Sequence, residues 1–241
     1  MPEALRLSGL VAGYRPDLPI LRGIDLALEP GGMTAVVGPN GAGKSTLIKA
    51  IAGLVPISGG TVTRGGADIT GLRPDRMAEH GMAYVPQTDN VFRGLTIREN
   101  LDLALRRAGR AAPERLARLQ AMFPMLADKA DIRGGALSGG QRQMLAVAMA
   151  LATEPSLVML DEPSAGLAPN ITADVLAMAR RLTEDGTTVL LVEQNVKQAL
   201  ALADRCIVLA EGRIEADGPA TELREGTTLA EIFLGARRRV A

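Results

Sequence analysis

The chain has 241 residues, enough for one domain, or two closely joined lobes, around a substantial core. Its 27 Lys and Arg residues balance its 27 Asp and Glu residues, so net charge gives no argument for nucleic-acid binding. No apolar run approaches the ~18 residues that cross a bilayer, and the first residues lack the pattern of an export signal. The single cysteine, Cys206, excludes an internal disulfide and fits a reducing cytoplasm, where we expect the protein to be.

Two short strands are predicted at the start of the chain. Leu5–Val11 and Ile24–Leu28 are apolar or alternating runs, and the glycines and prolines between them indicate turns. Tyr14 lies between these runs. Its ring could stack on an adenine base or pack against the protein, and its position alone fits both interpretations.

A glycine-rich motif, GPNGAGKST, follows the apolar run 33–37 and precedes a predicted helix over 47–52, which is the context of a phosphate-binding loop. Its glycines let main-chain N–H groups and the positive end of the helix surround a phosphate. Lys44 supplies charge for the outer phosphates, and Ser45 offers a hydroxyl to magnesium. We therefore predict a nucleotide site formed by Gly38, Pro39, Asn40, Gly41, Ala42, Gly43, Lys44, Ser45 and Thr46.

Short elements follow this helix. The sequence predicts a hairpin over Gly59–Asp68, a short helix over Arg73–Glu79, and a strand over Met82–Val85 that leads to Gln87. His80, the only histidine, has no Cys or His partner, so we interpret it as a surface or turn residue and not as a metal ligand.

A helical insertion is predicted over residues 88–142. Thr96–Arg107 and Pro113–Leu126 carry apolar residues at helical spacing, with Arg and Glu between them. Thr96 and Glu99 have the spacing of a capping box at the start of the first helix.

The pentapeptide LSGGQ at 137–141 precedes a predicted helix from Gln141 to Ala152. Glycines before a helix expose N–H groups to an anion, but an ordinary turn at a helix start has the same pattern. Taken alone, the ordinary turn is the better interpretation. With the phosphate loop present, we regard Ser138, Gly139, Gly140 and Gln141 as candidate nucleotide-binding residues.

Leu157–Leu160 is an uninterrupted apolar run, as expected for a strand buried on both faces of a parallel sheet. It ends in Asp161 and Glu162. Ligands of open α/β sheets lie at the carboxyl ends of the strands, so Asp161 can reach the shell of a magnesium ion and Glu162 an attacking water. A solvated acidic turn is the alternative.

The remaining pattern predicts alternating helices and strands in one core lobe that comprises 1–87 and 143–241. The elements are a helix over Pro169–Glu184, a strand over Thr187–Val192 followed by Glu193, Gln194 and Asn195, a helix over Val196–Ala203, a strand over Cys206–Ala210 and a hairpin beginning at Gly212–Ile214. The final ARRRVA, residues 236–241, is predicted to be a solvated tail, with a contact to anionic lipid or a partner as the alternative.

With GPNGAGKST, LSGGQ and LVMLDEP in this order, the chain resembles the ATP-binding subunits of ABC transporters along nearly its whole length. The resemblance implies an α/β fold of the P-loop NTPase class, with a RecA-like core, an N-terminal antiparallel β subdomain and a helical insertion. It implies that Tyr14 stacks on adenine, and that Gln87 touches magnesium and relays motion to a membrane partner. It also implies ATP and Mg²⁺ as cofactors.

In that family two subunits sandwich two ATP molecules, and each site pairs the phosphate loop of one subunit with the LSGGQ of the other. Ser138, Gly139 and Gly140 would then serve a nucleotide on the opposite chain. Glu162 would polarise the attacking water, and Lys44 would stabilise charge on the leaving oxygens. The implied partners are a second ATPase subunit, identical or related, integral membrane permease subunits and, indirectly, a substrate-binding protein, with this chain on the inner face of the cell membrane.

The segments DEPSAGLAP, LLVEQN and EIFLG look most like the ATPase subunits of branched-chain amino-acid importers. Relatives in that group handle urea or short amides. The same motor could also serve export or lipid handling, and an ATP-gated regulatory module with little hydrolysis is a further alternative.

Two positions depart from the general family pattern. Gln194 stands where most members have a histidine that bonds the γ-phosphate, and Ala168 where an aspartate usually links the subunits. A glutamine amide can donate a hydrogen bond but cannot become cationic, so we expect slow turnover, with Gln194 in the catalytic role.

Overall fold

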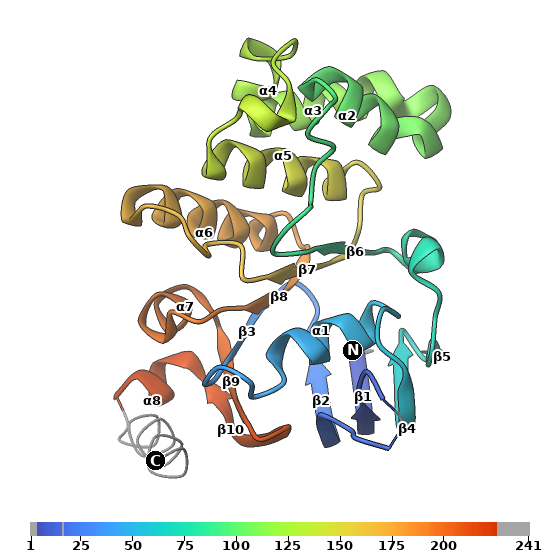
Figure 1. Cartoon of the computed structure of the whole chain (residues 1–241), viewed down its shortest axis with the longest axis vertical. Coiled ribbons are helices and arrows are strands. Elements are labelled where there is room, and N and C mark those ends of the chain that lie inside the picture. Colours follow the sequence, from blue (N-terminus) through green and yellow to red (C-terminus); the bar gives the residue numbers. More distant parts are fainter. Residues whose placement is uncertain (1–3, 16, 226–241) are drawn as a thin grey trace.

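The computed structural model describes residues 4–15 and 17–225 (Figure 1). The predicted arginine-rich tail, 236–241, lies outside the described residues. The described residues form two β-sheets, with helices on both faces of the larger one (Figure 1).

The larger sheet has six strands in the order β10-β9-β3-β8-β7-β6, and all neighbours are parallel except β9 and β10. β3, β7 and β8 are buried along their whole length, which agrees with their uninterrupted apolar sequences. Because Val192 pairs with both Val36 and Asp161, the carboxyl ends of these three strands lie side by side. The bounds are β3 Met33–Val37, β6 Met82–Val85, β7 Leu157–Asp161, β8 Thr188–Val192, β9 Arg205–Ala210 and β10 Arg213–Pro219.

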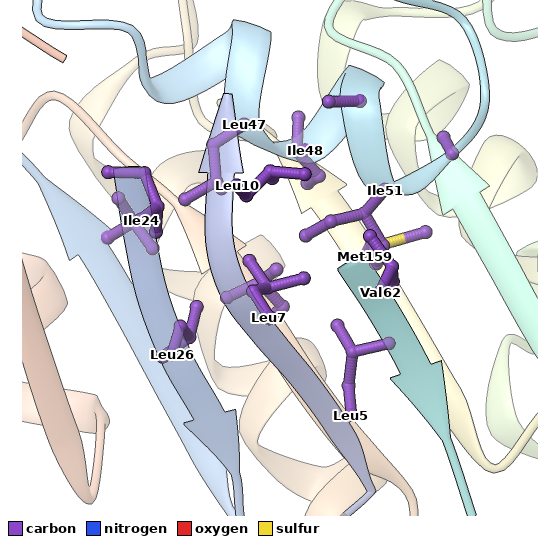
Figure 2. Packing of buried hydrophobic residues seen from close by; sticks show 14 of the residues in the cluster. Leu5, Leu7, Leu10, Ile24, Leu26, Leu47, Ile48, Ile51, Val62 and Met159 are labelled. Carbon is purple, nitrogen blue, oxygen red and sulfur yellow. The ribbon is translucent and has the colours of Figure 1, made fainter. Parts of the chain in front are cut away.

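The smaller sheet is antiparallel, in the order β2-β1-β4-β5, as the N-terminal strand patterns predict. Leu5, Leu7 and Leu10 of β1 project from one face toward the helix α1, whose apolar side chains pack above them (Figure 2). The bounds are β1 Leu5–Ala12, β2 Leu21–Leu28, α1 Lys44–Ile51, β4 Ile57–Arg64 and β5 Ala67–Asp68.

Alternate residues of the larger sheet face two different sets of helices. Met159 and Leu190 join the core under α1 and the smaller sheet, whereas Val158 and Leu191 join the core under α5 and α6. A third cluster packs α7 and α8 against β3 and β9. Consequently α1 and α5 lie on opposite faces of the sheet (Figure 1). The bounds are α5 Gly139–Leu151, α6 Pro169–Glu184, α7 Val196–Leu202 and α8 Ala220–Glu225.

The segment between β6 and α5 is helical, as the sequence predicts, and Thr96 and Glu99 form the predicted capping box at its start. The prediction of one helix over Pro113–Leu126 is wrong. α3 ends at Met122, because Phe123 leaves helical geometry (φ −130°, ψ 79°) and Pro124 has no N–H to continue the helix. The limits of the insertion, 88–142, stay a prediction. The bounds are η1 Pro74–His80, α2 Ile97–Leu105, η2 Arg106–Ala111, α3 Ala112–Met122, α4 Met125–Asp128 and η3 Gly134–Ala136.

No helix within the described ranges combines the length and the apolar character that crossing a membrane requires.

Candidate functional site

The predicted phosphate-binding loop connects β3 to α1. A side chain at Gly38 would place its Cβ 2.0 Å from the carbonyl oxygen of Leu209, so only glycine fits the start of the loop. Gly43 is the N-cap of α1, and no side-chain hydrogen bond caps it. The first N–H groups of the helix are therefore available to an anion.

Lys44 lies inside this loop. Its Nζ donates to the carbonyl oxygens of Gly38 (2.9 Å) and Pro39 (3.2 Å), and the residue is only 4% exposed. Burial lowers the pKa of its ammonium group, and the carboxylates of Glu162, Asp161 and Glu193 oppose that shift. The positive charge is thus buried at the place where the outer phosphates of a nucleotide would lie.

Ser45 and Asp161 meet as predicted. The Ser45 hydroxyl donates to Asp161 Oδ1 (3.0 Å), and the Tyr84 hydroxyl donates to Asp161 Oδ2 (3.2 Å). Burial, and then the charge of Asp161, raise the pKa of Tyr84, so the phenol stays protonated and can donate. The sequence analysis missed Tyr84, because its role depends on the pairing of β6 with β7, where Tyr84 lies opposite Met159.

The hydroxyl of Ser45 and the carboxylate of Asp161 are hard oxygen ligands of the kind that Mg²⁺ prefers. Within the described ranges, no group of three or more His, Cys, Asp or Glu side chains is placed to hold a metal. Ser45 and Asp161 alone fit Mg²⁺, because this ion usually takes one or two protein ligands and completes its shell with waters and phosphate oxygens.

Glu162 is held by two glutamines. Its Oε2 accepts hydrogen bonds from Gln87 Nε2 (3.0 Å) and Gln194 Nε2 (2.6 Å), although the three residues are far apart in the sequence. Its backbone has φ +48°, a left-handed conformation that costs a non-glycine residue on the order of 1–3 kcal/mol. Gln87, for which we expect contact with magnesium, here contacts Glu162.

Glu193 is a further carboxylate that the sequence analysis did not assign. It is 2% exposed, and its two oxygens accept from the backbone N–H groups of Ser164 and Gln194, both at 3.2 Å. Burial raises the pKa of its carboxyl group, and the charge of Glu162 acts in the same direction. A pocket of about 290 Å³ is lined by Glu162, Ser164, Glu193 and Gln194, among others. An acidic residue directly after an apolar strand was the available signal.

The LSGGQ segment forms the start of α5. Ser138 and Gln141 cap the helix reciprocally: the Gln141 N–H donates to Ser138 Oγ (3.3 Å), and the Ser138 N–H donates to Gln141 Oε1 (3.1 Å). A Cβ on Gly140 would lie 2.1 Å from Ile171 Cγ2, so this glycine lets α5 pack closely against α6. Gly139 is similarly close to Leu167 (2.7 Å). Because α5 and α1 cover opposite faces of the sheet, the chain's own phosphate loop and LSGGQ do not form one site (Figure 1).

The two remaining candidate positions lie at the surface. Tyr14 follows β1 and is 57% exposed, so its ring can be reached by a ligand, and its adenine-stacking role stays a prediction. Ala168 is the N-cap of α6 and provides no side-chain cap.

Comparisons with known proteins point the same way as this geometry. The ABC transporter family profile matches residues 21–165. The chain is 42% identical over 233 residues to the probable branched-chain amino acid transport ATP-binding protein LivF of Archaeoglobus fulgidus, covering 96% of this chain and 98% of that protein. It is 34% identical over 226 residues to the high-affinity branched-chain amino acid transport ATP-binding protein BraG of Pseudomonas aeruginosa, covering 93% and 97%.

The fold agrees with a solved structure of a dimeric ATP-binding cassette in a post-hydrolysis state with ADP and Pi. The TM-score is 0.78 at 25% sequence identity, over 90% of this chain and 98% of that one. The predicted P-loop NTPase fold, with a mixed sheet and an antiparallel N-terminal sheet, is confirmed. The chain therefore belongs to the ABC transporter family, as an ATP-binding subunit that hydrolyses ATP.

Proposed function

We propose that this subunit drives an importer of branched-chain or other hydrophobic amino acids, and that permease subunits hold it at the inner face of the cell membrane. One observation carries the catalytic part: the Glu162 carboxylate lies at the end of β7, next to the phosphate loop, and two glutamine amides fix it there. The names of LivF and BraG support the substrate class. The relatives reported above are transport proteins, so they give no support to a regulatory module.

The site residues divide the work of hydrolysis. The amides of the loop and the ammonium of Lys44 hold the outer phosphates of ATP, and Lys44 exchanges its bonds to the Gly38 and Pro39 carbonyls for phosphate oxygens. Ser45 and Asp161 would hold Mg²⁺, which supplies positive charge to the phosphate oxygens when it is bound. Tyr84 keeps the Asp161 carboxylate oriented.

Glu162 orients and polarises the water that attacks the γ-phosphorus. A bond forms from the water oxygen to that phosphorus, the bond to the bridging oxygen of the β-phosphate breaks, and Glu162 takes up a proton of the water and passes it to the phosphate, so that ADP and inorganic phosphate are formed. Gln194 holds the carboxylate through Nε2 and remains neutral throughout, whereas a histidine could become cationic.

A second subunit completes the site in this proposal. Ser138 and Gly139 begin a helix on the face of the sheet opposite α1, so they are available to a nucleotide on a facing copy or on a related chain. The dimeric state of the solved cassette supports this arrangement. A substrate-binding protein would act only through the permease.

Replacement of Glu162 tests the catalytic role. We expect Glu162→Gln to lower kcat by roughly 100-fold or more, because the neutral amide cannot act as the base, while ATP binding is kept and ATP-bound dimers accumulate on size exclusion. Glu184→Gln, at the exposed end of α6, is the matched control and should hydrolyse ATP normally. Unchanged turnover in Glu162→Gln would contradict the assignment.

Transport tests the substrate class. The chain would be co-purified with its membrane partners, reconstituted in vesicles with ATP, and assayed with labelled leucine, urea and a lipid substrate. Leucine uptake that requires intact Glu162 supports the proposal, and movement of urea or lipid without leucine contradicts it.

A further inference from the structure

One side-chain amide joins the end of β6 to the helix that carries LSGGQ. Asn90 lies in the connection between β6 and α2, and its Nδ2 donates to the carbonyl oxygen of Pro86 (3.3 Å) and to Oε1 of Gln143 on α5 (2.8 Å). The two acceptors are 57 residues apart, the difference between positions 86 and 143, and belong to different elements. Asn90 is thus a bridge between two segments with separate roles in the proposed site.

The orientation of both amides follows from this bridge. The Pro86 carbonyl can only accept, so Asn90 must turn its NH₂ group toward it. Gln143 must then present its oxygen to Asn90, which sends its Nε2 the other way. Gln143 is 5% exposed, and Nε2 is buried without a hydrogen-bond partner in the described part of the chain. A buried donor without an acceptor is unfavourable, so the chain keeps the bridge through Asn90 although it leaves Nε2 unpaired.

Gln143 lines a cavity of about 180 Å³ that separates the loop after β6, the start of α5 and the loop after β7. The residues of this cavity include Gln87, Asn90, Gly139, Arg142, Gln143 and Leu167.

The bridge extends to the hydrolytic carboxylate. Gln87, the neighbour of Pro86, donates to Glu162, while Gln143 lies one helical turn beyond Gly139 in the first half of α5. A displacement of Gln87 would also move its neighbour Pro86. The two hydrogen bonds of Asn90 would transmit that movement to Gln143 and the N-terminal turn of α5. The shortest covalent route between these segments instead runs through the whole helical insertion.

We propose that Asn90 and Gln143 are positioning residues that set the N-terminal turn of α5, and with it Ser138, according to the state of Glu162. The two hydrogen bonds of Asn90 hold the first half of α5 in a fixed position relative to the end of β6. This inference rests on the proposed role of Ser138 at a nucleotide on the facing subunit.

The test uses the full chain with Asn90→Ala, Gln143→Met, the double variant and Gln143→Glu. Methionine keeps the volume of glutamine without its amide, and glutamate keeps an oxygen for Asn90 in a cavity that Arg93 and Arg142 also line. Gln120→Met, a half-buried glutamine on α3, is the control. The readouts are kcat and KM for ATP, the affinity of the monomer for a fluorescent ATP analogue, Tm, and ATP-dependent dimerisation in a Glu162→Gln background.

We expect each of Asn90→Ala and Gln143→Met to lower kcat and to weaken dimerisation by about tenfold, because the facing residues are misplaced. Monomer affinity for ATP and Tm should stay close to those of the unmodified chain. The double variant should be no worse than the more impaired single variant, since both remove one bridge. Gln143→Glu should recover most of kcat.

The proposal is overturned if the single variants keep full kcat, if their losses multiply in the double variant, or if Gln143→Glu is as impaired as Gln143→Met. Should Gln143→Met fail to fold, Asn90→Ala decides, because that position is only half-buried. Failure of the proposed function looks different: the unmodified chain itself then shows no ATP-dependent dimer, whatever the state of the bridge.

Discussion

Glycines lie at the starts of both α1 and α5, and the two helix starts differ in structure. At α1 no side chain caps the helix, and the loop encloses the buried ammonium of Lys44 with three carboxylates nearby. At α5 the side chains of Ser138 and Gln141 each accept the other residue's backbone N–H, and the glycines allow close packing against Leu167 and α6. Glycines at a helix start therefore have two different structural reasons. At α1 they leave main-chain amides open to an anion, and at α5 they allow a close helix contact.

The largest expected effect is on ATP affinity, which should depend on the charge at the start of α1 and not on the cap of α5. Lys44→Ala should weaken ATP binding to the monomer by roughly 100-fold or more, because the phosphates lose a buried charge-assisted partner. Lys49→Ala, on the last turn of the same helix, is the matched control and should bind normally. Ser138→Ala should bind ATP as a monomer with full affinity, yet lose about 1 kcal/mol of stability with its N-cap. Isothermal titration calorimetry measures the affinity for ATP, and urea unfolding measures the free energy of unfolding. Equal losses of ATP affinity in Lys44→Ala and Ser138→Ala would contradict the proposed difference between the two helix starts.

An intermediate effect probes the packing of the second turn. Gly140→Ala adds a Cβ that meets Ile171 Cγ2, so α5 must move away from α6, at a cost of about 1–3 kcal/mol. We expect lower unfolding free energy and weak ATP-dependent dimerisation, with unchanged binding of ATP to the monomer. Ile171→Ala in the Gly140→Ala background should restore part of the dimerisation. Wild-type stability in Gly140→Ala would show that packing does not require this glycine.

The smallest effect concerns pH and belongs to the first turn alone. Burial raises the pKa of Glu193 above its unfolded value, so the folded chain favours the neutral carboxyl group. This contribution to stability is complete below the unfolded pKa and is lost as pH rises through the folded pKa. Glu193→Gln should therefore flatten the fall in unfolding free energy over that window relative to the unmodified chain. Parallel curves for the two proteins, from urea unfolding at a series of pH values, would contradict this.

Local chemistry made much of the site predictable. The phosphate loop, Asp161 and Glu162 were predictable because each follows an apolar strand and carries its chemistry within a few residues. Glu193 also follows an apolar strand, but its place beside Glu162 depends on which strands are neighbours. Tyr84 has no local signal, because only the pairing of β6 with β7 brings its hydroxyl to Asp161. The break at Phe123 was missed because the apolar spacing continues through it.

The left-handed backbone at Glu162 has a consequence for how this protein balances durability against use. Glycine would adopt that conformation with the least loss of free energy, so selection for stability alone would favour glycine at this position. Keeping the carboxylate of Glu162 leaves strained backbone directly after β7 in every folded molecule. A variant with glycine at this position should therefore unfold at a higher temperature and no longer hydrolyse ATP.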